Sequence, residues 1–302
     1  MPESQRDVRN RIASVRNIQK ITRAMEMVAA ARLRRAEQRI EALRPYAQAI
    51  RRMTREAAEA AGSLPRLPIL TERAEIQTVA LLLVAGDRGL AGAFNSNIIR
   101  AGVAAGRELG ADGRKVTYYA SGRRIASSLS FRGLEPAASF TGFSDRPAYA
   151  DARRIAERLM ADYVDGELDR VEVIYNGYVS AIRQEVRRET LLPLQQASVM
   201  EERHEEDDSQ RERAAQRALV EYEPDPEEIL ARLVPDYVEI SVYRALLEST
   251  ASEHGARMTA MRNASDNAGT LIEDLTLQMN RARQAEITQE IMEVVAGAEA
   301  LG

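Results

Sequence analysis

The sequence predicts a mixed α+β protein, in which two long terminal helices form an antiparallel coiled coil and a Rossmann-like α/β domain with a mostly parallel sheet is inserted between them. Apolar or small residues recur in steps of three and four near both ends of the 302-residue chain, which is the helical period. Between those ends, helical patterns alternate with strand patterns, as in βαβ units. Tryptophan is absent and aromatic residues make up only 5% of the chain, which suits packing of helix on helix.

Residues 1–62 are expected to form the N-terminal coiled-coil helix. Ser4 is a candidate N-cap, with Asp7 three residues further on. Pro45 should kink or locally loosen the helix, because proline lacks the amide hydrogen that the helical ladder uses. The apolar stripe shifts its phase once and consists of Val8, Ile12, Val15, Ile18, Ile21, Met25, Val28, Ala29, Leu33, Ala36, Ile40 and Leu43.

Residues 74–194 are expected to form the inserted α/β domain. The nearly continuous apolar run at residues 76–85 is typical of a central strand that is buried on both faces. The patterns that follow predict strands near residues 115–120, 171–179 and 185–192, and helices near residues 94–109, 123–130 and 149–163. The alternation of strands and helices predicts parallel pairing.

Residues 195–224 form an acidic segment that is expected to be mobile. Over residues 199–228 there are 12 acidic and 4 basic side chains, which is too charged a stretch to bury.

Residues 225–302 are expected to form the C-terminal coiled-coil arm. Asp225 followed by Pro226 is a helix start signal, and the short helix that it opens should end before Pro235. The long helix should then run over residues 236–299, a length of roughly 95 Å at about 1.5 Å per residue. Its stripe is Met258, Met261, Ala264, Ala268, Leu271, Leu275, Met279 and Ala282.

Several function classes are excluded or disfavoured by residue usage. Without cysteine there is no disulfide framework, thiolate nucleophile or cysteine zinc site. The only histidines, His204 and His254, have no neighbour at metal-ligand spacing. No metal site and no thiol-based or histidine-based catalytic residue is therefore predicted. The longest apolar run is far shorter than the roughly 20 residues of a membrane span, and residues 1–25 lack the pattern of a signal peptide.

Three glycines, Gly86, Gly89 and Gly92, stand between a predicted strand and a predicted helix, where doubly wound folds bind phosphates. Their spacing differs from the dinucleotide fingerprint and from the P-loop. Two readings stay open here: a structural or protein-contact turn, or a nucleotide-binding α/β protein with a coiled-coil oligomerisation arm.

The N-terminal arm is basic, with 14 Arg or Lys against 6 Asp or Glu over residues 1–56. Nucleic-acid binding is disfavoured, because no aromatic residues interleave the arginines for base stacking. A solvated face, or a face that meets an acidic protein, is the simpler interpretation. Near the other end, Arg283, Gln284, Thr288 and Glu290 form either a solvated face or a directional grip on a partner.

Three motifs in the same order resemble the gamma subunit of F-type ATP synthase. They are Ile12–Ala29, the turn Gly86-Asp87-Arg88-Gly89-Leu90 with Gly92–Asn95, and Asp266-Asn267-Ala268 with residues 281–291. The resemblance implies a central rotor stalk whose coiled coil turns inside a ring of alternating alpha and beta subunits. It implies that the α/β domain is a foot on the membrane c-ring beside the epsilon subunit. Ion-driven rotation of that ring would then drive ATP synthesis or hydrolysis at the beta subunits, with no catalytic residue or cofactor in this chain.

The resemblance also assigns residues. Met25 matches a methionine near the rotor–stator contact, and Arg283, Gln284, Thr288 and Glu290 match residues that touch the beta subunits. Gly86, Asp87, Arg88 and Gly89 match a segment of the foot domain. Ala91 stands where many relatives have cysteine, and the thiol switch of the chloroplast form is excluded. In a bacterium, the family places such a chain peripherally on the cytoplasmic face of the plasma membrane, with no span of its own and no nucleic-acid partner.

Overall fold

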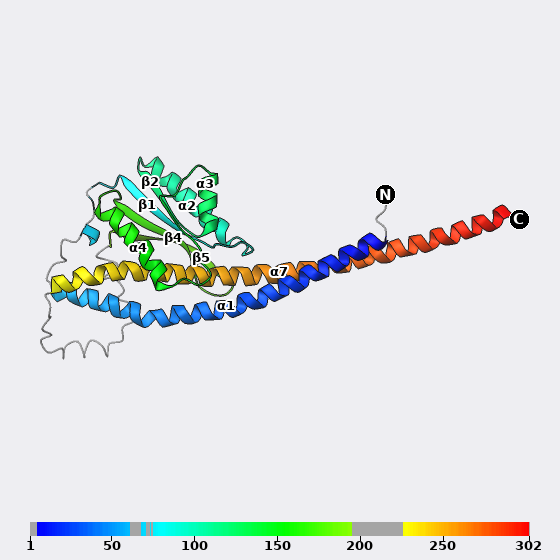
Figure 1. Cartoon of the computed structure of the whole chain (residues 1–302), viewed down its shortest axis with the longest axis horizontal. Coiled ribbons are helices and arrows are strands. Elements are labelled where there is room, and N and C mark those ends of the chain that lie inside the picture. Colours follow the sequence, from blue (N-terminus) through cyan, green and yellow to red (C-terminus); the bar gives the residue numbers. More distant parts are fainter. Residues whose placement is uncertain (1–4, 61–67, 71–72, 74, 195–225, 302) are drawn as a thin grey trace. The chain divides into compact units, whose positions relative to one another are not determined.

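The computed structural model describes residues 5–60, 68–70, 73, 75–194 and 226–301 (Figure 1). The chain divides into two compact units, one of residues 32–256 and one of residues 1–31 with 257–302. The boundary falls inside both long helices, α1 (Gln5–Ala60) and α7 (Pro226–Leu301), so each unit holds a stretch of each helix. The acidic segment that the sequence predicts at residues 195–224 lies outside the described residues.

The larger unit is built on a five-stranded sheet with the order β3-β2-β1-β4-β5. The strands are β1 (Thr78–Val84), β2 (Lys115–Ser121), β3 (Ala138–Phe140), β4 (Arg170–Tyr178) and β5 (Gln184–Leu192). The first four strands pair in parallel, which confirms the mostly parallel sheet. Strand β5 pairs antiparallel to β4, because the short connection between them leaves no room for a crossover.

Strand β1 divides the core of this unit into two layers because successive side chains point to opposite faces. Its odd-numbered residues Val79, Leu81 and Leu83 pack with the helices α2 (Phe94–Ala111) and α3 (Arg123–Phe131). Its even-numbered residues Ala80, Leu82 and Val84 pack with α4 (Tyr149–Val164) and with the N-terminal part of α7. The sheet is thus covered by helices on both faces, as a buried parallel sheet requires.

Helix α7 corrects one prediction, since no break precedes Pro235 and the helix is continuous over 76 residues. A proline inside a helix costs about 3 kcal/mol. The neighbouring Val234 and Val238 are fully buried in the core of the larger unit, and burying one such side chain contributes roughly 1.5–3 kcal/mol. Packing therefore outweighs the local cost. Helix α1 likewise continues through Pro45.

Two short elements have no counterpart in the sequence prediction. They are the three-residue strand β3 and the 3₁₀ helix η1 (Pro68–Leu70). Neither is long enough to show a period of its own.

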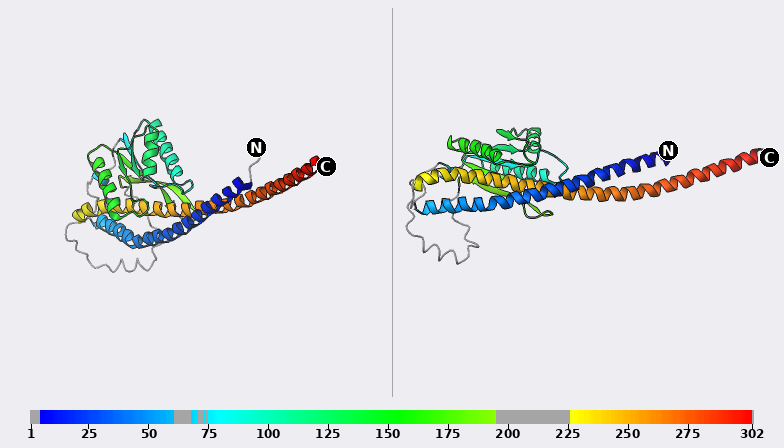
Figure 2. Two further views of the ribbon diagram at one scale, coloured as in Figure 1. Left: turned by 45° about the vertical axis from the view of Figure 1, so that its right-hand side comes forward. Right: turned by 60° about the horizontal axis from the view of Figure 1, so that its bottom comes forward.

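The smaller unit is a pair of antiparallel helices, seen from two further directions in Figure 2. Residue numbers that rise along α1 meet falling numbers on α7. The Gln5 amide lies 3.5 Å from the Glu286 carboxylate, and Arg262 donates to Glu26 at 2.9 Å. Val8, Ile12 and Leu275 form the buried apolar cluster of the pair, which confirms the predicted coiled coil in this unit.

The seam of the helix pair departs from the predicted stripe after Val15. Ile18 and Ile21 are 54% and 59% exposed, whereas Thr22 is buried. A straight α-helix drifts relative to a heptad repeat, and the drift brings Thr22 to face Ser265, with their hydroxyl oxygens 2.6 Å apart. A polar pair thus stands where the sequence pattern predicts an apolar one.

Candidate functional site

The glycine turn at the end of β1 is held by Asp87. Its carboxylate accepts hydrogen bonds from the amides of Arg123 at 2.9 Å, Gly142 at 2.9 Å and Ser144 at 3.2 Å. Arg123 is the first residue of α3, so the carboxylate sits at a helix N-terminus, where backbone amides and the helix dipole favour an anion. A carboxylate of the chain itself thus occupies a position that a bound phosphate takes in nucleotide-binding folds.

The backbone amides at the start of the turn are also engaged. The Gly86 amide donates to Asn95 Oδ1 at 2.9 Å, and the Asp87 amide donates to Ser144 Oγ at 2.8 Å. Asn95 in turn donates to the Arg88 carbonyl at 3.0 Å, which closes the turn onto the start of α2. Two amides that would be needed to cradle a phosphate are therefore satisfied internally.

Helix α7 closes the crevice beyond the carboxyl ends of the strands, the usual ligand position in doubly wound sheets. Ser252 donates to the Asn176 carbonyl at 3.0 Å, and Thr250 donates to the Ser144 carbonyl at 2.9 Å. Glu253 lies so close to Gly86 that a Cβ there would come within 2.8 Å of its carboxyl group. The geometry argues against the nucleotide-binding reading of this turn.

The glycines near this turn differ in how closely other atoms approach the position of a Cβ. A Cβ on Gly89 would meet only the end of the Arg124 side chain, at 2.9 Å. Gly122, which the sequence reading missed, has a φ of 108°, and a Cβ there would lie 2.2 Å from the Ala85 carbonyl oxygen. Its signal in the sequence was a glycine directly between a strand and a helix.

The middle of β5 is tied to α7 by ion pairs. Arg187 contacts Glu248 at 2.8 Å, and Arg244 contacts Glu189 at 2.7 Å. Burial raises the pKa of Glu248, and the two nearby guanidinium groups of Arg244 and Arg187 oppose that rise. These pairs fix the antiparallel edge of the sheet against the long helix.

In the helix pair, Met25 is half-buried, whereas Arg283, Gln284, Thr288 and Glu290 are all exposed. The Thr288 hydroxyl donates to the Gln284 carbonyl at 2.8 Å. The structure therefore gathers the four C-terminal residues along one stretch of α7, with Met25 elsewhere in the same unit.

The C-terminal part of α7 exposes apolar side chains. From residue 283 to residue 297 every residue is exposed. The set includes Ile287, Ile291, Met292, Val294 and Val295, with exposed fractions between 47% and 72%. Contiguous exposed apolar surface of this kind marks an interaction site.

Among the residues that the structure describes, no helix combines the length and the apolar character needed to cross a membrane. In the same ranges, no group of three or more histidine, aspartate or glutamate side chains is arranged to hold a metal ion.

Known proteins match this chain along almost its whole length, and the matches name the same protein complex. Residues 4–301 match the family model described as ATP synthase. The ATP synthase gamma chain of Rubrobacter xylanophilus is 43% identical over 298 residues, which cover 99% of this chain and 98% of that protein. The corresponding protein of Desulfitobacterium hafniense is 44% identical over 300 residues, which cover 99% of each chain.

Solved structures give the same fold. A chain of the central stalk and c-ring structure of Tetrahymena thermophila mitochondrial ATP synthase is 28% identical, with a TM-score of 0.58 over 81% of this chain and 99% of that chain. A chain of the Euglena gracilis mitochondrial enzyme, at 18% identity, has a TM-score of 0.65 over 98% and 94% of the two chains. The protein therefore belongs to the family of ATP synthase gamma chains.

Proposed function

We propose that this chain is the central rotor stalk of an F-type ATP synthase. It couples ion-driven rotation of the membrane c-ring to ATP synthesis or hydrolysis at the beta subunits. The observation that carries the proposal is the exposed apolar stretch of α7 over residues 283–297. A lone helix with such a surface is stable in water only when a partner covers it, and a surrounding ring of alpha and beta subunits would do so.

The chain acts mechanically in this proposal and contributes no reacting group. A rotor can bias a ring of three equivalent catalytic sites only by contacting each site differently, because a ligand shifts an equilibrium only through unequal affinity for its states. Paired helices with no threefold symmetry meet that requirement. The internal engagement of the glycine turn supports a chain that binds no nucleotide there.

Residues near both ends of the chain are the proposed contacts with the surrounding subunits. Arg283, Gln284, Thr288 and Glu290 grip the beta subunits with charge-assisted hydrogen bonds, and Met25 lies near the rotor–stator contact. The exposure of the four C-terminal side chains supports this role.

The remaining segments are proposed from the family. Residues 74–194 serve as a foot that rests on the c-ring and meets the epsilon subunit, with Gly86, Asp87, Arg88 and Gly89 as a turn of this foot domain. Residues 1–62 and 225–302 supply the coiled-coil arms, and residues 195–224 form a separate acidic segment. For a bacterial host, such as those of the two sequence relatives, we propose a peripheral location at the cytoplasmic face of the plasma membrane.

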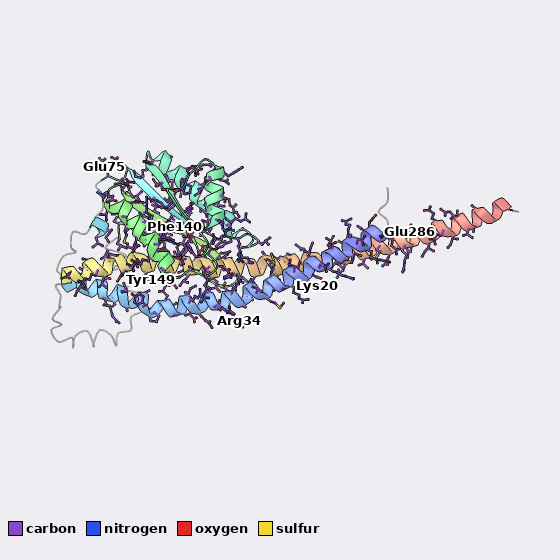
Figure 3. All side chains as sticks on the ribbon, in the orientation of Figure 1. Lys20, Arg34, Glu75, Phe140, Tyr149 and Glu286 are labelled. Atoms are coloured by element: carbon purple, nitrogen blue, oxygen red, sulfur yellow. The ribbon has the colours of Figure 1, made fainter. Side chains whose placement is uncertain are left out.

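Co-expression with alpha and beta subunits tests the proposal. We expect one copy of the chain in a stable particle with ATPase activity, measured by size-exclusion chromatography with light scattering and by phosphate release. A matched variant with Arg283→Ala, Gln284→Ala and Glu290→Ala should assemble less stably, whereas Arg34→Ala, which changes an exposed residue on α1 (labelled in Figure 3), should not. Binding of nucleotide to the isolated chain, with no particle formed, would favour the alternative of a nucleotide-binding protein.

A further inference from the structure

A small polar cleft lies within the larger unit, away from the glycine turn. It has a volume of about 260 Å³ and opens between α1, the loop after β3 and α7. Arg32, Arg35 and Arg39 line it from α1, and Arg146 lines it from the loop. The small side chain of Ala36, which is buried, leaves the space between the arginines open.

One wall of the cleft is fixed by Asp145. Both of its carboxylate oxygens accept hydrogen bonds from the Arg32 guanidinium, and one of them lies 3.7 Å from Nε2 of the buried His254. Thr250, also on this wall, is anchored through its hydroxyl to the Ser144 and Leu246 carbonyls at 2.9 and 2.8 Å. Arg32 is thereby neutralised and held in place.

No described residue compensates the charges of the other three guanidinium groups, of which those of Arg35 and Arg146 are exposed. Among the described residues, none forms a hydrogen bond or ion pair with the side chains of Arg35, Arg39 or Arg146. Arg35 and Arg39 are four residues apart on α1, a spacing at which like charges repel by roughly 0.2–0.5 kcal/mol. A sequence that gathers three such cations at one cleft bears a local cost that a bound anion would offset.

We propose that this cleft binds a phosphate-class oxyanion, held by Arg35, Arg39 and Arg146. Three cations from two directions match a compact anion that carries about two charges and several acceptor oxygens, whereas a single carboxylate offers one charge. The cleft is smaller than the roughly 300 Å³ at the lower end of ordinary ligand pockets. It therefore takes inorganic phosphate or pyrophosphate, or the terminal phosphates of a nucleotide whose base stays outside.

This site would join α1 to the loop at residues 141–148 and so stiffen the larger unit when it is filled. The inference goes beyond the rotor proposal and does not depend on it. Particle assembly tests the rotor, and anion binding to the chain tests the cleft, so either can fail alone.

Isothermal titration of the full-length chain with phosphate, pyrophosphate and ADP tests the site. We expect saturable binding of one anion per chain that weakens as the sodium chloride concentration rises. Arg39→Gln and Arg146→Gln should each weaken it at least about tenfold, which is about 1.4 kcal/mol. Arg34→Gln removes the same charge from an exposed position of α1 outside the cleft and should change the affinity less than about twofold.

Thermal unfolding of the same variants provides a second measurement. Pyrophosphate should raise the Tm of the parent chain and of Arg34→Gln, because a ligand that binds only the folded state stabilises it. It should leave the Tm of Arg39→Gln and Arg146→Gln unchanged. Since these substitutions remove repulsion, their Tm without the anion should equal or exceed that of the parent.

The outcomes separate the sources of the anion. Binding of ADP as tight as that of pyrophosphate, with the same losses in the two variants, assigns the site to nucleotide phosphates. Tighter binding of phosphate or pyrophosphate than of ADP assigns the cleft to inorganic anions. Unsaturable binding, equal loss in Arg34→Gln, or capture of a glutamate-rich peptide without any phosphate binding would overturn the proposal.

Discussion

At the scale of single residues, Asp87 holds the turn that follows the carboxyl end of β1. It accepts three backbone hydrogen bonds from two other segments. Asp87→Ala removes three hydrogen bonds to a charged acceptor, and a hydrogen bond to a charged group contributes about 1.5–3 kcal/mol. We expect the free energy of unfolding in urea to fall by at least about 2 kcal/mol. Arg88→Ala, in the same turn but with an exposed side chain, should change it by less than about 0.5 kcal/mol. Equal effects of both substitutions would contradict the role given to Asp87.

Gly122 and Gly89 offer a matched pair of residues near the same turn. Gly122→Ala would place a Cβ 2.2 Å from a backbone carbonyl oxygen at a φ of 108°, so the backbone itself must move. We expect a loss of at least about 2 kcal/mol of stability, since strain of this kind costs roughly 1–3 kcal/mol before any clash is counted. Gly89→Ala meets only the flexible end of Arg124 and should lower the Tm by no more than a few degrees. A milder effect at Gly122 than at Gly89 would show that the turn relaxes freely.

At the scale of elements, the buried hydroxyl pair of Thr22 and Ser265 sets the register between α1 and α7 in the helix pair. The amide of Gln19 also donates to the Ser265 carbonyl, at 3.2 Å. Thr22→Val leaves the Ser265 hydroxyl without its partner and should cost about 1–3 kcal/mol. Thr22→Val with Ser265→Ala removes both hydroxyls and should recover most of that loss. A double-mutant cycle measured by urea unfolding reports this coupling. Additive losses would mean that the pair does not interact in solution.

The elements also show how far sequence reasoning extends. The apolar run of β1 predicted a central strand that is buried on both faces. All six residues from Val79 to Val84 are buried, which confirms it. The departures arise where distant residues decide the outcome. Thr22 enters the seam only because Ser265 faces it, and the partners of Asp87 lie 36 to 57 residues further along the chain. Helix α7 continues through Pro235 because the packing of neighbouring side chains in the core outweighs the cost of a proline inside a helix. That packing involves other elements, so the sequence of the helix alone does not show it.

At the scale of the whole molecule, the absence of cysteine permits a clean test of rotation. Thr22→Cys with Ser265→Cys places two thiols where the hydroxyl oxygens are 2.6 Å apart, so oxidation should link α1 to α7 within the shaft. Because both helices belong to the rotor, ATP hydrolysis by the assembled particle should stay within about twofold of the reduced value. Met25→Cys, oxidised to a cysteine on a facing ring subunit, joins rotor to stator. It should lower hydrolysis at least about tenfold, with recovery on reduction.

Met25 is the better anchor for the second link because it is half-buried in the helix pair. A link near residue 290 would pull on an exposed part of α7, which can unwind locally while the rest of the shaft turns. Confirming each link by non-reducing gel electrophoresis separates a failed oxidation from free turning. Full activity with the Met25 link formed would mean that catalysis proceeds without rotation at this level of the shaft. Equal losses from both links would instead show that the helix pair must deform internally during each turn, and the shaft would then act as a spring in series with the ring.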